Sequence, residues 1–161
     1  MSFTIIEKGS ILNSCPNYLV IPVTSRGDIP LSKLEILENN FNGYYDSYIK
    51  ACQDSKIKMG EELHTYYNNG TQLISFPIGD YNVSPRNIEL FNNTVDKLKE
   101  YLTIESKRFR YILFRPDVAI SQLYGYDSKV LPNEKVLEIL KEKLGDIRAN
   151  INYYNKYFYT I

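Results

Sequence analysis

The sequence has no tryptophan, one histidine and two cysteines, and these shortages exclude several kinds of site. A structural zinc site needs about four Cys or His ligands, whereas the chain offers three such residues, Cys15, Cys52 and His64. One histidine allows at most one pairing with a serine or cysteine nucleophile, and nothing in the sequence around His64 suggests one. Two thiols in a cytosolic domain are usually reduced and inert. We therefore expect no metal site, no catalytic triad and no cofactor.

The chain also lacks an excess of charge, because 19 Lys and Arg residues balance 19 Asp and Glu residues. Proteins that bind nucleic acid by neutralising its phosphates are usually basic, so we expect no direct nucleic-acid binding. No segment approaches the run of about 20 apolar residues that spans a membrane, and the N-terminus lacks the layout of a signal peptide. These observations predict a cytoplasmic protein without a membrane partner, located in the host cytoplasm if the chain is viral.

What the chain does have is enough apolar sequence for one folded domain over residues 1–161, with 43% hydrophobic residues. At roughly 100–200 residues per domain, this length is typical of a single domain with a core of its own. The residue usage is unusual, because 15 tyrosines accompany abundant Asn, Ile and Lys. Such a bias is typical of an AT-rich genome, and the small genome of a phage would fit it.

Hydrophobic periodicity and turn residues divide the chain into alternating strands and helices. The strongest local signal is a hairpin whose turn contains Asn69-Gly70. The full prediction is strands at 3–7 and 18–23, a helical stretch at 31–51 interrupted near 39–43, hairpin strands at 63–67 and 71–76, a helix at 84–103, a strand at 111–114, a loop at 115–128, a helix at 133–144 and a last strand at 149–161. This order predicts an α/β fold with a mixed, largely parallel sheet and helices on both faces.

Ligands of such sheets bind at the loops that follow the carboxyl ends of the strands. The predicted strands therefore direct attention to three loops, which follow Val23, Phe76 and Phe114. The first of them, Thr24-Ser25-Arg26-Gly27, is small and polar, as a ligand-contacting loop or a plain surface loop would be.

Several segments together match a known pattern. They are Lys8-Gly9-Ser10-Ile11-Leu12, then Leu19 to Gly27, then Tyr44-Tyr45-Asp46-Ser47-Tyr48-Ile49-Lys50-Ala51-Cys52 with Lys58-Met59-Gly60-Glu61, and finally Leu73-Ile74-Ser75-Phe76-Pro77. Over nearly its whole length the chain resembles the macrodomain family, and its third segment resembles the antitoxin-type branch that removes ADP-ribose from DNA. The resemblance implies a three-layer α/β/α fold and an ADP-ribose-like small-molecule ligand.

The resemblance also implies which residues contact that ligand. They are Ser10, Ile11, Thr24, Ser25, Arg26, Gly27, Phe76, Pro77, Ile78, Ala119, Ile120, Ser121 and Tyr124. Within this set, Ala119-Ile120-Ser121 stands where the family has the Gly-Cys-Gly loop whose bare amides wrap a diphosphate.

Several positions depart from the family pattern where its chemistry would lie. Ser10 replaces the acid that accepts the adenine amino group, and Ile21 and Thr24 replace the two asparagines of the first loop. The antitoxin-type branch often has Thr-Lys after the strand that ends in Phe-Pro, whereas here Phe76-Pro77 is followed by Ile78-Gly79-Asp80, which supplies no lysine. These changes indicate a degenerate active site, and no catalytic residue is assigned.

Alternative roles stay open for the remaining candidates. The aromatic rings of Phe76, Tyr124 and Tyr126 could stack on adenine or ribose, or belong to the core or its rim. Asp117 or Asp127 could act as a general base, although acids in a long loop are usually just solvated. Compensating positive charge could come from Arg26, Arg115 and Lys129, which are equally compatible with a solvated surface.

Three functions are compatible with these residues. The first is binding of an ADP-ribose-like or NAD-derived nucleotide without efficient catalysis, which in a phage protein could sequester an immune signal as a counter-defence. The second is an ADP-ribosyl hydrolase acting on ADP-ribosylated nucleic acid or protein. The third is a vestigial pocket with a protein partner bound through the tyrosine-rich tail at 153–159, since aromatic residues are enriched at interfaces.

Overall fold

The computed structural model describes residues 2–7, 11–27, 31–79, 87–107, 115–123 and 132–154. Its strands and helices alternate along the chain as the hydrophobic periodicity predicts. They are β1 (Ser2–Ile6), the 3-10 helix η1 (Ile11–Ser14), β2 (Tyr18–Thr24), α1 (Leu31–Asn40), α2 (Tyr44–Gln53), β3 (His64–Asn68), β4 (Thr71–Gly79), α3 (Asn87–Ser106), β5 (Asp117–Ser121), α4 (Asn133–Leu144) and β6 (Asn150–Tyr154).

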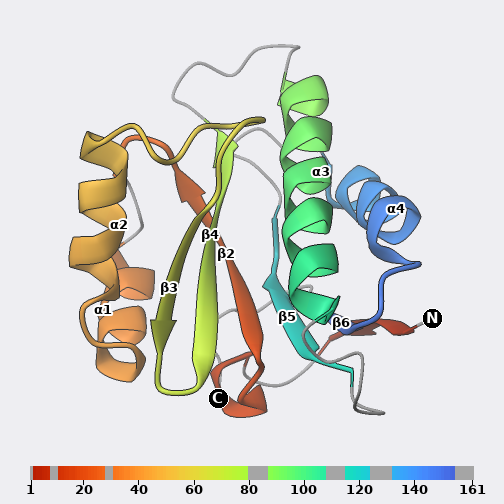
Figure 1. Cartoon of the computed structure of the whole chain (residues 1–161), viewed down its shortest axis with the longest axis horizontal. Coiled ribbons are helices and arrows are strands. Elements are labelled where there is room, and N and C mark those ends of the chain that lie inside the picture. The colour runs from red at the N-terminus through yellow and green to blue at the C-terminus, as the bar shows by residue number, and fades with distance from the viewer. Residues whose placement is uncertain are drawn as a thin grey trace.

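The six strands form one mixed sheet in the order β1-β6-β5-β2-β4-β3. All neighbouring strands are parallel except β3, which runs antiparallel to β4 at the edge of the sheet. The pair α1 and α2 lies on one side of the sheet and the pair α3 and α4 on the other (Figure 1). The predicted α/β fold with helices on both faces is therefore confirmed. In the described part of the chain, no helix is long and apolar enough to cross a membrane.

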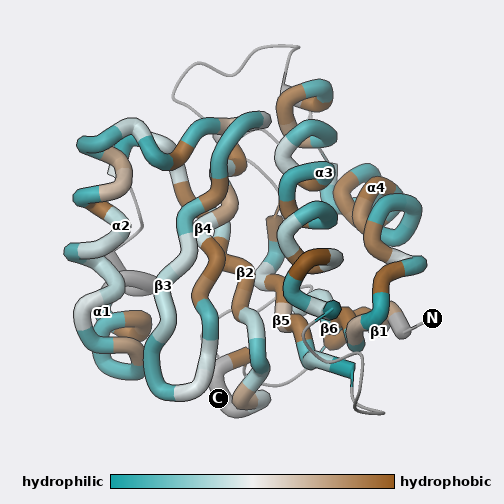
Figure 2. Tube along the Cα trace, in the orientation of Figure 1, coloured by the Kyte–Doolittle hydropathy of each residue, from teal (hydrophilic) through white to brown (hydrophobic). Residues whose placement is uncertain are grey.

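The core consists of two apolar layers, one on each face of the sheet. Because side chains alternate along a strand, Val20 of β2 packs toward α3 and α4, whereas Leu19 and Ile21 pack toward α1 and α2. Every residue of β2 is buried, as expected of a central parallel strand covered on both sides. Figure 2 shows the resulting hydrophobic stretches of β2 and β4 between the two helical layers.

The predicted hairpin and the predicted helix break both follow from residues at positive φ. Asn69 and Gly70, the two central residues of the β3–β4 turn, have φ of 52° and 83°, which is the combination that a type I′ turn requires. The helical stretch is broken by Gly43, at φ 90°. The Gly43 N–H donates to Glu38 Oε2 at 3.2 Å, and the Tyr45 N–H donates to Glu38 Oε1 at 2.5 Å. The Glu38 carboxylate thus connects the end of α1 to the start of α2.

One predicted loop is wrong, because residues 117–121 of the expected loop at 115–128 form β5. The strand has a polar residue at each end, Asp117 and Ser121. The Asp117 N–H donates to Asn17 Oδ1 at 2.9 Å, and the Asp117 carboxylate accepts from Asn150 Nδ2 at 3.1 Å. Between those ends stand three buried residues, a run too short to indicate a strand. The expected strand at 111–114, the helix start at 84–86 and the last strand beyond Tyr154 lie outside the described residues.

Candidate functional site

The carboxyl ends of β2 and β5 lie side by side at the point where the chain reverses its direction across the sheet. After β2 the chain passes through α1 and α2 on one face and proceeds to the β3–β4 hairpin, whereas after β5 it passes through α4 on the opposite face and proceeds to β6. In open α/β sheets a ligand crevice lies outside the carboxyl ends of strands at such a switch point. The candidate site is therefore built from the residues that end these two strands.

A proline limits the pairing of β2 with β5. The ladder runs from Tyr18–Val118 to Val20–Ile120 and goes no further, although β5 continues to Ser121. The Asn17 carbonyl, just before β2, accepts a hydrogen bond from the Gln72 N–H of β4. Because backbone groups alternate in direction along a strand, the odd-numbered residues of β2 turn their N–H and C=O groups toward β4 and the even-numbered residues turn theirs toward β5. The backbone of Pro22 therefore faces β5 but has no N–H to donate. The missing donor explains why the ladder ends at the pair Val20–Ile120.

Ser121 carries an unsatisfied polar atom at this point. Its side chain is fully buried, and in the described part of the chain its Oγ has no hydrogen-bond partner. Side-chain alternation places Ser121 on the same face as Ala119, toward α1 and α2. A buried hydroxyl without a partner costs about 1–3 kcal/mol, so it needs an explanation. A ligand group that bonds to it would supply one.

The loop after β2 is attached to helix α2. The register between β2 and β4 shifts between Val23 and Thr24. The Thr24 carbonyl accepts a hydrogen bond of 2.6 Å from the buried phenol of Tyr48. The Thr24 Oγ1 accepts from the N–H of Arg26 at 3.4 Å, which closes a short turn. Gly27 follows at φ 93°, a conformation that favours glycine.

Beside this loop is an open pocket of about 360 Å³ lined by Ser25, Arg26, Ile49, Cys52 and Gln53. Its polar groups are the Ser25 hydroxyl, the exposed Arg26 guanidinium and the Gln53 amide. Such a set can bind phosphate, hydroxyl or carboxylate groups through hydrogen bonds and one positive charge. Two of the predicted residues, Ser25 and Arg26, meet here, and Thr24 and Gly27 flank them in the chain.

The other predicted contact residues are in the core or outside the described part of the chain. Ile11 and Ala119 are buried in the layer beneath α1 and α2. On the other face, Ile78 packs against the core and the buried Phe76 contacts the ring of Phe91 at a centroid distance of 5.7 Å. Of the two roles considered for Phe76, the structure therefore shows the core role. Pro77 is buried in β4, and Ser10 and Tyr124 lie outside the described residues.

The three residues predicted to form a diphosphate loop belong to a strand. Ala119, Ile120 and Ser121 do not form a loop, because all three pair with β6 as part of β5. Gln122 and Leu123 follow β5, and residues 124–131 lie outside the described part of the chain. Of the three predicted residues, Ser121 is the one at the end of the strand.

The candidate acid Asp117 and the candidate cation Arg115 lie at the amino end of β5, opposite the candidate site. Asp117 begins β5, so it is at the amino end, four residues from Ser121 and about 13 Å away at the rise of a strand. Arg115 precedes it and is exposed there. Asp127, Lys129 and Tyr126 lie outside the described residues. Within the described ranges, no group of three or more His, Cys, Asp and Glu side chains could hold a metal ion.

The Tyr44–Cys52 segment carries part of the family resemblance, but its contacts with the loop after β2 were not predicted from the sequence. Tyr44, Tyr48 and Cys52 recur at steps of four, so they share one face of the helix. The Tyr44 hydroxyl bonds to Ser75 Oγ at 2.6 Å, Tyr48 bonds to Thr24, and Cys52 Sγ lies 4.0 Å from the same Thr24 carbonyl. Burial raises the pKa of both tyrosines above the usual value, so both phenols stay protonated. The four-residue spacing was the signal that could have identified this face.

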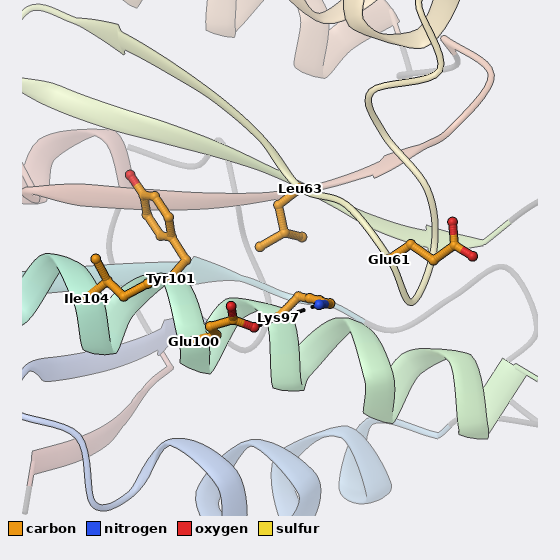
Figure 3. Close-up of a pocket in the computed structure, with 6 residues that line it drawn as sticks. All are labelled: Glu61, Leu63, Lys97, Glu100, Tyr101 and Ile104. Carbon is orange, nitrogen blue, oxygen red and sulfur yellow. Dashed lines mark ion pairs between the residues drawn. The ribbon is translucent and has the colours of Figure 1, made fainter.

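Two other features do not belong to the site. A hollow of about 310 Å³ lies between the segment before β3 and helix α3, and Figure 3 shows Leu63 pointing toward the helix there. Its charged residues include Lys97 and Glu100, which pair with each other at 3.7 Å. In the tyrosine-rich tail, Tyr153 and Tyr154 are buried in β6, which removes support for a docking surface there; residues 155–159 lie outside the described part.

No protein-family model matches the sequence, and a search of curated proteins found no match. Solved structures do match. The macrodomain of Thermus aquaticus DarG is 17% identical, with a TM-score of 0.71 over 96% of this chain and 98% of that one. The macrodomain of Mycobacterium tuberculosis DarG is 16% identical, with a TM-score of 0.67 over 97% and 100%.

A third structure, Thermosipho africanus DarTG in complex with ADP-ribose, is 15% identical. Its TM-score is 0.74, and the match covers all of this chain and 43% of that one. Identities this low define the architecture alone. The six-stranded sheet, the two helical layers and these matches show that the chain has the macrodomain fold.

Proposed function

We propose that the protein binds an ADP-ribose-like or NAD-derived nucleotide at the carboxyl ends of β2 and β5 and holds it without efficient catalysis. The observation that carries the proposal is the buried, unpartnered hydroxyl of Ser121 at the switch point of the sheet. The similar Thermosipho africanus structure is described as a complex with ADP-ribose, which supports this choice of ligand.

The chemistry of the described residues suits a neutral-to-anionic ligand rich in hydroxyl groups. Ser121 and Ser25 each offer a hydroxyl that can donate or accept, and Arg26 offers a positive charge. Backbone N–H groups at the end of a strand can bind phosphate oxygens. Ribose hydroxyls and phosphates together match this mixture of donors and acceptors.

The same residues offer no general base. Among the described residues that end β2 and β5 or line the pocket beside them, none is Asp, Glu or His. Asp117 is at the opposite end of β5, and His64 bonds to Ser47 of α2. The lack of a general base among these described residues supports binding without turnover, and in a phage protein such binding would withdraw an NAD-derived signal from the host.

The experiment is calorimetric titration with ADP-ribose, a cyclic ADP-ribose, NAD and AMP, for the wild type and for Ser121→Ala. We expect micromolar binding of at least one of these nucleotides. Ligand at 100 times its Kd should stabilise the fold by about 2.7 kcal/mol. Ser121→Ala removes an unsatisfied buried hydroxyl, so without ligand it should leave the stability unchanged or raise it by about 1 kcal/mol, while affinity falls about tenfold.

Ser106→Ala is the matched control. Ser106 is also a buried serine, but its hydroxyl bonds to the Thr103 carbonyl at 2.9 Å at the end of α3, so affinity should not change. Absence of binding at millimolar concentrations of every nucleotide would reject the proposal. A Ser121→Ala protein that is less stable yet binds normally would remove Ser121 from the site.

Catalysis is tested separately, by incubating the protein with ADP-ribosylated DNA and with ADP-ribosylated protein. We expect no release of ADP-ribose above the rate without protein. Efficient release from either substrate would overturn the second half of the proposal and favour a hydrolase. Binding of the nucleotide would stand in that case.

A further inference from the structure

We propose that Tyr48 is a positioning residue, which holds the loop of residues 24–27 in the shape that binds the ligand. This inference rests on the proposed function for the identity of the ligand, but the shape of the loop can be measured without any ligand. Its basis is the direct contact between helix α2 and the end of β2.

A buried hydrogen bond joins Tyr48 to the loop. The Tyr48 phenol donates to the Thr24 carbonyl at 2.6 Å, and both residues are buried. Thr24 is the last residue of β2 and pairs with Gly79 after a register shift, so the regular ladder is interrupted just before it. A side-chain donor that reaches a backbone carbonyl at such a point fixes the direction in which the chain leaves the sheet.

Two further residues of α2 lie against this short loop. Ile49, next to Tyr48, has its Cδ1 2.9 Å from the position that a Cβ on Gly27 would occupy. Cys52, one turn further on, has its Sγ 4.0 Å from the Thr24 carbonyl. Tyr48, Ile49 and Cys52 thus form one continuous support for the loop.

Helix α2 is itself held in place by contacts with the sheet. Tyr44 bonds to Ser75 of β4 at 2.6 Å, and Ser47 Oγ lies 2.9 Å from His64 Nε2 of β3. The rings of Tyr44 and Tyr48 stack, with centroids 6.1 Å apart and planes 12° from parallel. A rigid support of this kind is what a preorganised binding loop requires.

The test compares Tyr48→Phe with Tyr66→Phe. Both substitutions remove one phenol that donates to a backbone carbonyl, since Tyr66 bonds to the Asn42 carbonyl at 2.7 Å, near the start of α2 and away from the loop. Amide hydrogen exchange in residues 24–27 should become about tenfold faster in Tyr48→Phe and stay unchanged in Tyr66→Phe. Exchange in residues 18–21 should stay unchanged in both.

Affinity is the second measurement. For whichever nucleotide the wild type binds, Tyr48→Phe should weaken binding about tenfold and Tyr66→Phe should not. If Tyr48→Phe does not fold, Gly27→Ala tests whether affinity depends on the shape of the loop that Tyr48 supports, and unchanged affinity would overturn the inference. It alters the loop at φ 93° against Ile49, and Gly70→Ala, at φ 83° with no atom within 4 Å of the added Cβ, is its control.

Equal exchange rates in residues 24–27 for the two tyrosine variants would overturn the inference. So would faster exchange in Tyr48→Phe with unchanged affinity, because the loop would then be held for stability alone. If the wild type binds no nucleotide, the proposed function fails, and the exchange comparison still decides whether Tyr48 holds the loop.

Discussion

The hydroxyl of Tyr44 and the hydroxyl of Ser75 form a buried hydrogen bond of 2.6 Å between helix α2 and the central strand β4. Both side chains are fully buried. Each hydroxyl is therefore protected from water, and each depends on the other. The bond explains how a helix with many polar residues stays against the sheet next to the loop that follows β2.

Loss of this bond should be costly when one partner remains. Tyr44→Phe leaves the Ser75 hydroxyl buried without the phenol to which it bonds. We therefore expect the free energy of unfolding to fall by about 1–3 kcal/mol. Urea denaturation measures the change. Adding Ser75→Ala to Tyr44→Phe should recover part of the loss, and a double variant no more stable than Tyr44→Phe would contradict this explanation.

Gly43 should tolerate alanine much less well than Gly70. Both glycines have positive φ, of 90° and 83°, so alanine at either position costs about 1–2 kcal/mol of backbone strain. A Cβ at Gly43 would also lie 2.6 Å from the Tyr66 hydroxyl oxygen, whereas one at Gly70 meets no atom within 4 Å. Thermal unfolding should show a larger loss for Gly43→Ala, and equal losses would show that Tyr66 moves freely.

His64 should make stability depend on pH below neutrality. Burial lowers the pKa of His64 from its ordinary value of 6.5, so the unfolded chain takes up a proton at a higher pH than the folded chain. Stability should therefore be fully present above about pH 6.5 and should fall as the pH drops through that value.

Urea midpoints at pH 7.5 and 5.5 measure this dependence. His64 is the one histidine of the sequence, so in His64→Gln the difference between the two midpoints should be smaller than in the wild type. An identical difference in the two proteins would show that carboxylates alone cause the pH dependence.

Pro22→Val should lengthen the ladder between β2 and β5. Valine restores an N–H that faces β5 next to Ser121, and one further backbone hydrogen bond should stabilise the fold by about 1 kcal/mol. The strands would then stay together further toward their carboxyl ends, so nucleotide affinity should fall. Calorimetry and thermal unfolding measure the two effects, and a variant that gains stability yet binds as tightly as wild type would show that the gap at Pro22 is not part of the site.

Much of the fold could be predicted from local sequence signals. The helix at 133–144 has apolar residues at helical spacing and ends before Gly145, and the structure has those bounds. The hairpin follows from Asn69-Gly70 and the helix break from Gly43. The strand at 117–121 could not be predicted in this way, because its buried centre is three residues long and its ends are polar.

The site was predicted less completely, because its main features depend on register. The sequence indicates the loop after β2, and Ser25 and Arg26 do line a pocket there. That Pro22 faces β5 rather than β4 depends on which strands are its neighbours, and no local pattern contains that information. The bond from Tyr48 to Thr24 likewise joins residues 24 positions apart.

The early end of the β2–β5 ladder also has a kinetic consequence. A pyrrolidine ring cannot acquire an N–H, so β2 and β5 lack the next bond of their ladder whether or not a ligand is present. A nucleotide would then meet an entrance that already exists, and little of its binding energy would be spent on separating the strands. Association should follow a single phase whose rate rises linearly with nucleotide concentration, without the plateau that a slow opening step produces.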